Sequence, residues 1–567
     1  MVYRSIYKPH KGFLENLLVK GGTIDMKKAF TKVLAATLGM LFCLVVTVNA
    51  DSSDSPWPTQ YGGGSPRPTA IPALREWTAG SGSFQIGSQP WIIISPDDVH
   101  CLSEDAQIFA NDLQAVTGHA GRVKITNAAP GLGDVLLELG STDDSIGNEG
   151  YELLIGSSVY IKARTSAGVF YGTRTLLQLL KQNSLVPAGV ARDWPRYSER
   201  GLMMDTARHF YSYNWLEDRI REMAYLKLNY LRLHLTDDQG WRIESKQGLQ
   251  SPQFYTKEQI QRLVALAARY HITVVPEIEM PGHMGWALKS YPMFRLKDNN
   301  GVANPDKIDY SIPAAREFLK SLVKEYLPLF CGQYWHMGAD EFLSNNDYQK
   351  YPQLEQYAKE SCGPNATARD GFDALINQIN ALVRADGKTL RIWSDSLSPE
   401  TTVKVDKNVI IDWWTDLNGS DLSPAELPQQ ILDEGYSIQN CSFWPTYDYN
   451  PIDYPPPPTI EGMYETWAVQ RFHGLMPTFY DIDPAEPRNL GSELNYWNDG
   501  DDTGNLTEEQ CAANIFPRLR VMAQKTWESA PLVTTYTEFQ PIIESVGSAP
   551  SKPSKPASCN TDEAGLQ

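Results

Sequence analysis

The sequence has no excess of positive charge. Its 567 residues carry 50 lysines and arginines against 68 aspartates and glutamates, a formal net charge of −18. Such a chain repels phosphate backbones and lacks the basic surface that nucleic-acid binding requires. We therefore expect no nucleic-acid partner, and a neutral or cationic ligand instead.

Long apolar runs are nearly absent, which argues against several membrane spans. The one clear run is 33–48, and its 16 residues are fewer than the roughly 18 to 20 that a spanning helix needs. It follows a lysine pair and precedes Asn49-Ala50, the pattern of a signal peptide over Met26–Ala50. We expect a secreted or periplasmic protein with no stable membrane association after cleavage. An uncleaved anchor is the alternative.

Cysteine is scarce, and its spacing suits no zinc site. Apart from Cys43 in the apolar run, the cysteines are Cys101, Cys331, Cys362, Cys441, Cys511 and Cys559. Export would permit disulfides between some of these six, but the sequence leaves their pairing open.

Composition divides the chain into five parts. The segment DSSDSPWPTQYGGGSPRP is rich in Ser, Pro and Gly and is typical of a linker, and SAPSKPSKPAS near the end is typical of a tail. We expect an N-terminal extension with the signal peptide at 1–50, a linker at 51–69, a small α/β domain at 70–195, a large domain at 196–545 and a low-complexity tail at 546–567.

The small domain mixes short strands with helices. The runs WIIIS, DVLLELG, YELLIG and VYIKA are typical of strands, and LSEDAQIFANDLQAV and AGVFYGTRTLLQLL are typical of helices. No phosphate-binding loop or metal motif falls within it, so we interpret it as a structural accessory domain.

From Arg200 onward the chain alternates strand, loop and helix. Eight segments are predicted strands: GLMMDT, NYLRLHL, HITVVPEI, QYWHMG, TLRIWS, NVIIDWW, YSIQNCSF and GSELNYW. Eight such units over roughly 340 residues predict an α/β fold, a (β/α)8 or TIM barrel with long loops. Capping boxes at Asn214–Glu217 and Thr256–Gln259 mark the starts of two intervening helices.

Polar side chains follow the first four predicted strands. They are Asp205, Arg208, His234, Asp237, Glu279, His283, Asp340 and Glu341. The loops after barrel strands share one pocket, so we expect these residues to meet there. The adjacent carboxyls Asp340 and Glu341 can divide labour, because a protonated carboxyl donates to a leaving oxygen while an ionised one stabilises positive charge.

The later strands end in aromatic residues. They are Trp393, Trp413, Trp414, Trp444, Tyr447 and Trp497, with Asp395 and Asp499 close by in sequence. Indole rings stack on the apolar faces of a pyranose, and Arg208 with Asp499 can hydrogen-bond adjacent hydroxyls. Because neighbouring residues of a strand face opposite sides, we expect at least one of Trp413 and Trp414 to pack at the rim of the barrel.

Four ordered motifs resemble glycoside hydrolase family 20, the β-N-acetylhexosaminidases. They are GLMMDTARHF, HLTDDQGWRIES, PEIEMPGH and HMGADEF, and GNEGYELLIGSSVYIKARTSAGVFYGTRTLLQLL resembles the α/β domain that precedes that family's barrel. The resemblance covers residues 70 to 530 approximately. It implies a retaining exo-glycosidase that cleaves terminal β-linked N-acetylglucosamine or N-acetylgalactosamine from an oligosaccharide or glycoconjugate. It also implies that the substrate's acetamide is the nucleophile, and that no metal or cofactor is used.

The resemblance assigns roles to single residues. Glu341 matches the family's acid/base. Asp340 matches the residue that holds the acetamide nitrogen and stabilises the oxazolinium ion. Arg208 matches the arginine that binds the 3- and 4-hydroxyls of the sugar. The matches for the sugar pocket are Trp393, Trp413 or Trp414, Tyr447 with Tyr449 as an alternative, Trp497 and Asp499. The matches for the polar groups behind the acid pair are His234, Asp237 and His283.

The segment FWPTYDYNP around Tyr447 and three single positions depart from the family's pattern. Glu279 stands where Asp is common, Arg232 where an aromatic residue or His is common, and Asp499 where Glu is usual. The first two leave open the geometry behind the acid pair, and with it the tuning of the pair's pKa values.

Three other functions stay open. A lacto-N-biosidase releases a disaccharide by the same mechanism and needs room beyond the sugar 3-hydroxyl. A metal-dependent barrel hydrolase would use His234, Asp237, His283 and Asp340 as ligands, although no His-x-His motif closes the first strand. A sugar-binding protein without catalysis is the third, and the adjacent Asp340 and Glu341 argue against it.

Overall fold

The computed structural model describes residues 66–417, 424–449, 459–476, 478–499 and 506–551, without the side chain of Tyr449. All of them belong to one compact unit. The predicted signal peptide and most of the predicted linker lie outside the described residues. Within them, no helix is both long enough and apolar enough to cross a membrane.

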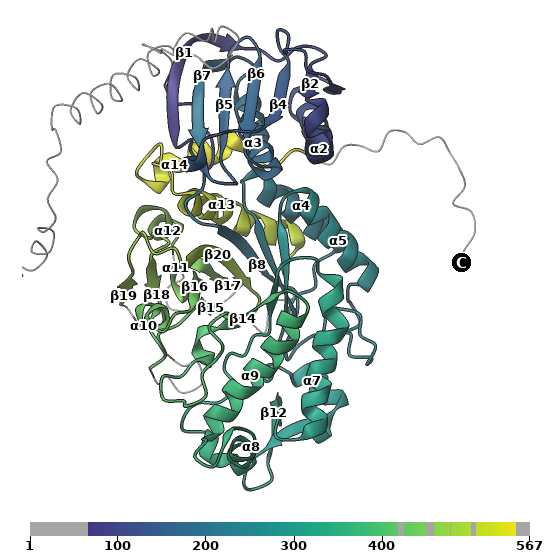
Figure 1. Cartoon of the computed structure of the whole chain (residues 1–567), viewed down its shortest axis with the longest axis vertical. Coiled ribbons are helices and arrows are strands. Elements are labelled where there is room, and N and C mark those ends of the chain that lie inside the picture. The colour runs from purple at the N-terminus through teal and green to yellow at the C-terminus, as the bar shows by residue number, and fades with distance from the viewer. Residues whose placement is uncertain (1–65, 418–423, 450–458, 477, 500–505, 552–567) are drawn as a thin grey trace, which may run out of the picture. The chain divides into compact units, whose positions relative to one another are not determined.

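The first part of the described chain builds a seven-stranded mixed sheet (Figure 1). The strands in spatial order are β1 (Glu76–Phe84), β7 (Val186–Asp193), β5 (Tyr151–Ile155), β6 (Val159–Ala163), β4 (Val135–Leu139), β2 (Trp91–Ile94) and β3 (Arg122–Ile125). Pairing is antiparallel from β1 to β6 and parallel from β6 to β3. Helices α2 (Val99–Thr117) and α3 (Ser166–Gln182) pack against each other and against the sheet.

The four predicted strands and two predicted helices of this part are present, whereas β1, β3 and β7 were not predicted. The reason is clear for two of them. Strand β3, RVKI, has no buried residue and therefore lacks the apolar alternation of a half-buried strand. Strand β1 contains Gly80 and Gly82, which are uncommon inside strands.

The second part closes into the predicted barrel of eight parallel strands. They are β8 (Glu199–Asp205), β9 (Tyr230–Thr236), β10 (Thr273–Ile278), β13 (Tyr334–His336), β14 (Thr389–Trp393), β15 (Ile410–Trp413), β16 (Ser437–Asn440) and β20 (Asn489–Trp497). Strand β20 pairs with both β8 and β16, which closes the barrel. A short extra strand, β17 (Tyr447–Tyr449), pairs with β20 as well. The fold class predicted from the sequence is confirmed.

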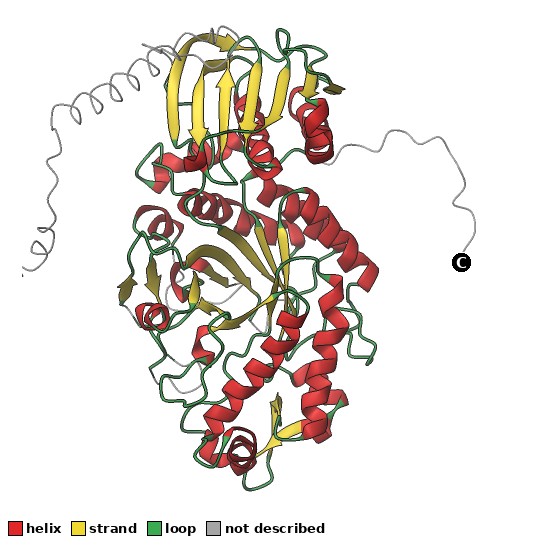
Figure 2. Cartoon of the chain, in the orientation of Figure 1, coloured by secondary structure: helices red, strands yellow, loops and turns green. Residues whose placement is uncertain are grey.

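Helices surround these strands (Figure 2). They are α4 (Tyr213–Tyr225), α5 (Lys257–Arg269), α6 (Gly285–Ser290), α7 (Pro313–Tyr326), α8 (Pro352–Cys362), α9 (Ala368–Ala385), α10 (Pro428–Asp433), α11 (Phe443–Thr446), α12 (Ile460–Glu465) and α13 (Glu508–Trp527). The last helix, α14 (Tyr536–Val546), packs against α3 of the small domain and against α12 and α13. Two hairpins extend from the loops, β11 (Arg295–Lys297) with β12 (Ala303–Ile308), and β18 (Arg471–His473) with β19 (Phe479–Asp481).

One of the two predicted helix starts is correct. Thr256 and Gln259 form a capping box at the start of α5, as predicted. Helix α4 begins two residues earlier than predicted, because its cap is Ser212 and not Asn214. The Ser212 side chain accepts a hydrogen bond from the Trp215 N–H and donates to Glu508, a residue distant in sequence.

The interior of the barrel is charged rather than aliphatic. Arg391 Nη2 lies 2.6 Å from Asp412 Oδ1, and Arg232 Nη1 lies 3.1 Å from Asp412 Oδ2. Arg232 also pairs with Glu493 and lies 4.1 Å from the ring centroid of Trp393. Barrel interiors are usually filled by Val, Ile and Leu. The unusual Arg232 is therefore balanced by buried carboxylates, and it supports an indole of the predicted sugar pocket.

The five cysteines in the described part form no disulfide with one another. They are Cys101, Cys331, Cys362, Cys441 and Cys511. The disulfides that export would permit are thus not formed among these five. Cys43 and Cys559 lie outside the described residues.

The chain stays packed beyond the start of the predicted low-complexity tail. Val546 is fully buried at the end of α14, and the Ala549 N–H donates to Glu222 Oε2 at 2.9 Å. Lys181 Nζ donates to the Ser548 carbonyl oxygen at 2.6 Å. Composition did not reveal this packing because the contacts come from α3 and α4, far away in sequence.

A buried ion pair joins β7 of the small domain to the barrel. Lys227 Nζ lies 2.9 Å from Asp193 Oδ2, and neither side chain has exposed surface. The Tyr151 hydroxyl and the Trp527 indole N–H donate to the same carboxylate at 2.6 and 2.8 Å. Burial lowers the pKa of Lys227, and Asp193 opposes this effect.

Lys227→Met should destabilise the fold by about 3 to 5 kcal/mol, because the buried Asp193 carboxylate loses its counter-ion. Thermal unfolding followed by circular dichroism should show a lower Tm. Lys359→Met is the control, because Lys359 and Glu355 form a pair with side chains 47% and 52% exposed, and such pairs contribute about 0–1 kcal/mol. Equal Tm values for both variants would contradict the prediction.

Candidate active site

The carboxyl ends of the barrel strands bring the predicted polar and aromatic residues to one face. The residues that meet there are Arg208, His234, Asp237, His283, Asp340, Glu341, Trp393, Trp414, Tyr447, Trp497 and Asp499. They lie at the ends of barrel strands, in the loops that follow, or on β17. Strand ends far apart in sequence thus build one site.

Asp340 and Glu341 lie in a tight loop after β13. Gly338, Ala339 and Glu341 have φ angles of 69°, 72° and 47°, a left-handed conformation that favours glycine. Space also requires glycine at 338, since an added Cβ would overlap the carboxylate of Glu279. The loop leaves 37% of the Glu341 side chain and 18% of the Asp340 side chain exposed. Both carboxyls are therefore accessible to a ligand.

The imidazole of His283 lies against both carboxyls of this pair. Its Nε2 is 3.5 Å from Asp340 Oδ2 and 3.4 Å from Glu341 Oε2, while Nδ1 is 3.3 Å from Asp237 Oδ1. Burial by itself would lower the pKa of His283, but Asp237 and Asp340 raise it well above its ordinary value. The surrounding carboxylates therefore favour the charged form of His283.

The two adjacent carboxyls have different environments. Burial raises the pKa of Asp340, as does the charge of Glu341, although His283 opposes both. Burial would also raise the pKa of Glu341, but the hydrogen bond and charge of His283 lower it overall. The two pKa values are thus pushed in opposite directions, Asp340 upward and Glu341 downward, which is the reverse of the roles that the resemblance implies for them.

Arg208 forms ion pairs with three carboxylates on another side of the site. Its Nη2 lies 2.9 Å from Asp237 Oδ2, and its Nη1 lies 3.0 Å from Asp499 Oδ1 and 3.3 Å from Asp205 Oδ2. The guanidinium lies over the Trp497 ring, 5.5 Å from its centroid. Burial raises the pKa of Asp499 to about 6 although Arg208 lowers it, and 34% of this side chain remains exposed. Arg208 and Asp499 thus form a polar edge beside an indole.

Aromatic rings line the remaining side and form a cluster of their own. Its buried members are Met203, Trp393, Trp414, Cys441, Phe443, Tyr447 and Trp497. The ring centroids of Trp393 and Trp497 are 6.1 Å apart, and the rings of Trp414 and Tyr447 are nearly parallel at 6.2 Å. Flat apolar walls beside carboxylates suit a sugar ring, whose C–H faces stack and whose hydroxyls hydrogen-bond.

Comparison with protein families agrees with this geometry. The model of the glycosyl hydrolase family 20 catalytic domain matches residues 197–530, and the model of that family's domain 2 matches residues 67–194. The chain belongs to glycosyl hydrolase family 20.

Relatives with curated names include two kinds of enzyme. The chain is 31% identical to a lacto-N-biosidase of Bifidobacterium bifidum over 85% of this chain and 42% of that protein. It is 28% identical to a beta-hexosaminidase of Porphyromonas gingivalis over 81% of this chain and 60% of that protein. The chain thus spans about half the length of these two relatives.

Solved family 20 structures share the fold. A chitobiase of Flavobacterium johnsoniae is 25% identical with a TM-score of 0.67, over 84% of this chain and 72% of that one. An exo-β-N-acetylglucosaminidase of Vibrio harveyi is 23% identical with a TM-score of 0.68, over 88% of this chain and 81% of that one.

The structure separates two neighbouring indoles that the sequence grouped together. Trp414 lies in the aromatic cluster of the site. Trp413 belongs to the main core, where its indole N–H donates to the Glu426 carbonyl oxygen at 3.0 Å and its ring packs on Phe472. Trp413 is therefore removed from the predicted sugar-binding set, for the reason that adjacent residues at a strand end face opposite sides. Tyr447 lies in the cluster, and the side chain of Tyr449 lies outside the described residues.

Two carboxylates of the site were not assigned a role from the sequence. Glu277 accepts a hydrogen bond from the Trp393 indole at 2.7 Å, and Asp395 accepts one from the Trp414 indole at 3.0 Å. Burial and the charge of Asp340 raise the pKa of Asp395 to about 7. The available signal was an acidic residue at the end of an apolar strand, which does not show which indole the carboxylate meets.

Glu279 lies beneath the acid pair. Its side chain is 1% exposed, and within the described part of the chain neither carboxyl oxygen has a hydrogen-bond partner. Burial, together with the charges of Asp340 and Glu277, raises the pKa of Glu279 well above its ordinary value. The family's usual Asp is thus replaced by a carboxyl whose surroundings favour the neutral form.

The contacts of Asp237 argue against its role as a ligand in the metal-dependent alternative. Asp237 Oδ2 already lies 2.9 Å from Arg208 Nη2 and 2.7 Å from His234 Nε2, and the other oxygen of Asp237 faces His283. A divalent cation bound to Asp237 would have to displace these contacts, and the guanidinium would repel it.

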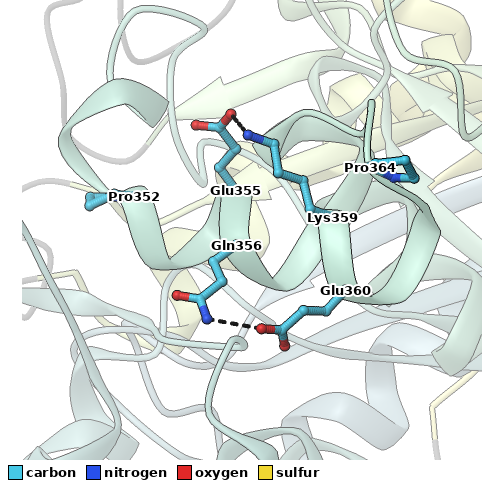
Figure 3. A pocket seen from close by; sticks show the side chains of 6 residues that line it. All are labelled: Pro352, Glu355, Gln356, Lys359, Glu360 and Pro364. Carbon is cyan, nitrogen blue, oxygen red and sulfur yellow. Dashed lines mark hydrogen bonds and ion pairs between the residues drawn. The ribbon is translucent and has the colours of Figure 1, made fainter.

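A separate surface hollow lies along α8 (Figure 3). It is lined by Pro352, Glu355, Gln356, Lys359, Glu360 and Pro364. Lys359 pairs with Glu355 at 2.6 Å, and Gln356 donates to Glu360 at 2.9 Å. These side chains pair along one helix face and do not converge on a ligand, so the hollow carries no chemistry.

His283 and His336 should differ in charge at neutral pH. Burial lowers the pKa of His336, so that ring should be neutral at pH 7 while the ring of His283 is charged. Imidazole ¹⁵N chemical shifts can test this in a chain with nine histidines. Asp237→Asn should lower the His283 pKa and serves to assign its signal. A neutral His283 at pH 7 would show that the carboxylates do not hold its proton.

The raised pKa of His283 also predicts that the stability of the fold depends on pH. Because the pKa of folded His283 lies above the unfolded value of about 6.5, its stabilisation is complete below that pH. It should be lost as pH rises through the folded-state pKa, which the Tm of wild type and of Asp237→Asn measured against pH would show.

Proposed function

We propose that this chain hydrolyses terminal β-linked N-acetylglucosamine or N-acetylgalactosamine with retention, using the substrate's acetamide as nucleophile. The observation that carries the proposal is the imidazole of His283 against both Asp340 and Glu341, at the same end of the barrel as a cluster of buried indoles. Family 20 glycosidases use substrate assistance. Relatives named beta-hexosaminidase and lacto-N-biosidase support the assignment.

The site offers separate surfaces to separate parts of the sugar. The pyranose ring stacks on an indole, for which Trp497 is placed beside Arg208. The Arg208 guanidinium and the Asp499 carboxylate exchange part of their mutual contact for adjacent ring hydroxyls. The acetamide enters between the rings of Trp393, Trp414 and Tyr447. A neutral sugar therefore fits a site whose charges are already paired.

The first chemical step breaks the glycosidic bond. Glu341 donates its proton to the glycosidic oxygen, which leaves with the bonding electrons as an alcohol. The acetamide carbonyl oxygen bonds to the anomeric carbon from the opposite face and forms an oxazolinium ion. Asp340 accepts a hydrogen bond from the acetamide N–H and stabilises the positive charge that develops.

The second step restores the acetamide. The Glu341 carboxylate takes a proton from water as the water oxygen bonds to the anomeric carbon, and the bond to the acetamide oxygen breaks. Two inversions at the anomeric carbon give net retention, and no enzyme carboxylate becomes glycosylated.

For the proposed roles, substrate binding has to oppose the pKa shifts of both members of the acid pair. Without ligand, burial raises the pKa of Asp340 while His283 lowers that of Glu341. An acetamide N–H that donates to Asp340 favours its ionised form. We infer that binding lowers the Asp340 pKa, and that the proton then resides on Glu341, with His283 within 3.5 Å of both carboxyls.

Variants of the acid pair test the mechanism. Glu341→Gln should lower kcat/KM about 10²- to 10⁴-fold on substrates with poor leaving groups, and far less on nitrophenyl glycosides, because an acidic phenolate leaves unaided. Asp340→Asn should slow all acetamido substrates about 10²-fold or more. Steady-state kinetics on the two leaving groups measures both effects.

A β-glucoside, which lacks the acetamide, is the matched substrate control and should be cleaved far more slowly. Equal rates on the β-glucoside and the β-N-acetylglucosaminide would overturn the mechanism. A covalent glycosyl adduct on Asp340 or Glu341, detected by mass spectrometry, would also overturn it.

A second candidate is release of a disaccharide by the same chemistry. The lacto-N-biosidase of Bifidobacterium bifidum is similar over 85% of this chain, and Asp499 is one methylene shorter than the family's usual Glu. The Asp499 side chain is 34% exposed at the polar edge where Arg208 lies. A shorter carboxylate there leaves space beyond the sugar hydroxyls.

Asp499→Glu tests this candidate by filling that space. If the chain releases lacto-N-biose, the variant should lose activity on the nitrophenyl lacto-N-bioside at least tenfold more than on the nitrophenyl N-acetylglucosaminide, because one methylene discriminates by about 1–3 kcal/mol. If wild type cleaves only the N-acetylglucosaminide, the disaccharide candidate is wrong and the exo-hexosaminidase assignment stands.

We also propose that the protein acts outside the cytoplasm. The support is the signal-peptide pattern over Met26–Ala50, which lies outside the described residues. The substrate would then be an extracytoplasmic oligosaccharide or glycoconjugate.

A further inference from the structure

Asp395 connects two parts of the site that lie on different strands. It follows β14 in the short turn η6 (Ser394–Ser396), and its side chain is almost fully buried. Its Oδ2 accepts the backbone N–H of Glu341 at 2.8 Å. Its Oδ1 accepts the indole N–H of Trp414 at 3.0 Å. One carboxylate therefore contacts both the backbone of the acid and a wall of the pocket.

The backbone at Glu341 needs such a contact. Its φ of 47° lies in the left-handed region, which is unfavourable for a residue with a side chain. The start of the same loop is held by a hydrogen bond from the Trp393 N–H to the Gly338 carbonyl oxygen at 3.0 Å. The bond from Glu341 to Asp395 holds its end. Without it, the acid could relax toward a more common conformation.

The bond to Trp414 holds one ring of the aromatic cluster. The Trp414 ring is nearly parallel to that of Tyr447, with an angle of 7° between the planes. The Trp414 backbone N–H is held separately, by the Ser394 hydroxyl at 3.3 Å. The indole N–H is thus the contact that orients the ring, and its acceptor is Asp395.

Asp395 is itself held in place. The Arg369 guanidinium donates to the carbonyl oxygens of Asp395, at 3.4 Å, and of Ser396. The Ser396 hydroxyl donates back to the Trp393 carbonyl oxygen. The turn that carries Asp395 is therefore tied to α9 and to the end of β14, so the carboxylate is a fixed reference for both of its partners.

We propose that Asp395 is a positioning residue, which fixes the proton donor Glu341 relative to the pocket wall that holds the acetamide. The inference rests on the proposed function. Its chemical basis is that a carboxylate offers an acceptor on each oxygen. An amide of the same shape would turn its NH2 group toward one of the two N–H donors. Asp395 thereby keeps the acid Glu341 and the acetamide nucleophile correctly placed on either side of the anomeric carbon.

Asp395→Asn tests the proposal with one sugar and two leaving groups. kcat/KM is measured on 4-nitrophenyl β-N-acetylglucosaminide and on chitobiose. Because a displaced Glu341 protonates the leaving oxygen poorly, the loss on chitobiose should be at least tenfold larger than the loss on the nitrophenyl glycoside. Turnover by wild type tests the proposed function, whereas only the ratio of the two losses tests Asp395.

Asp134→Asn is the matched control. Asp134 lies in the small domain and also accepts one backbone N–H on each oxygen, from Trp91 at 2.8 Å and Gly131 at 3.0 Å. It contacts no residue of the site, so it should change both substrates by the same factor. Equal losses on both substrates in folded Asp395→Asn, or no loss, would reduce Asp395 to a structural role and overturn the proposal.

Asp395→Ala is made in parallel in case the amide prevents folding. It leaves space in which water can accept either N–H, and it introduces no opposing donor. The same tenfold or larger difference between the two substrates is expected, and its absence in the folded variant would equally overturn the proposal.

Discussion

The carboxylate of Asp237 is the contact on which the rest of the site depends. It is almost completely buried and meets Arg208, His234 and His283. Burial would raise its pKa, but Arg208 and His283 hold that pKa well below the ordinary value. Through Arg208 it orients the edge assigned to sugar hydroxyls, and through His283 it reaches the acid pair. One buried carboxylate thus fixes the position of Arg208 relative to that of His283.

Buried ion pairs also hold side chains in place in the barrel interior, beneath the site. In the barrel interior, Arg232 and Arg391 share Asp412, and Arg232 lies against the Trp393 ring. Such an ionic layer is a poor source of net stability, but it holds its members in one geometry, since loss of either partner leaves an unpaired buried charge. A site built in this way presents dipoles and charges that are oriented before the substrate arrives.

The predictable part of the site followed from local rules. Polar residues after successive strands had to meet, because parallel strands of a barrel place their carboxyl ends on one face. The capping box at Thr256 was also predictable, since both partners lie within four residues. Ser212 was missed as a cap because Glu508, which supports it, is supplied by a distant helix.

The sequence by itself determined the barrel, the order of its strands and the residue types at their ends, because these depend on periodicity and chain order. Tertiary structure decided that Trp414 and not Trp413 faces the pocket, and that Asp395 meets Glu341. It also decided that the raised pKa of Asp340 and the lowered pKa of Glu341 differ in direction. These outcomes depend on distances between side chains from different strands, and no pattern along one strand contains such distances.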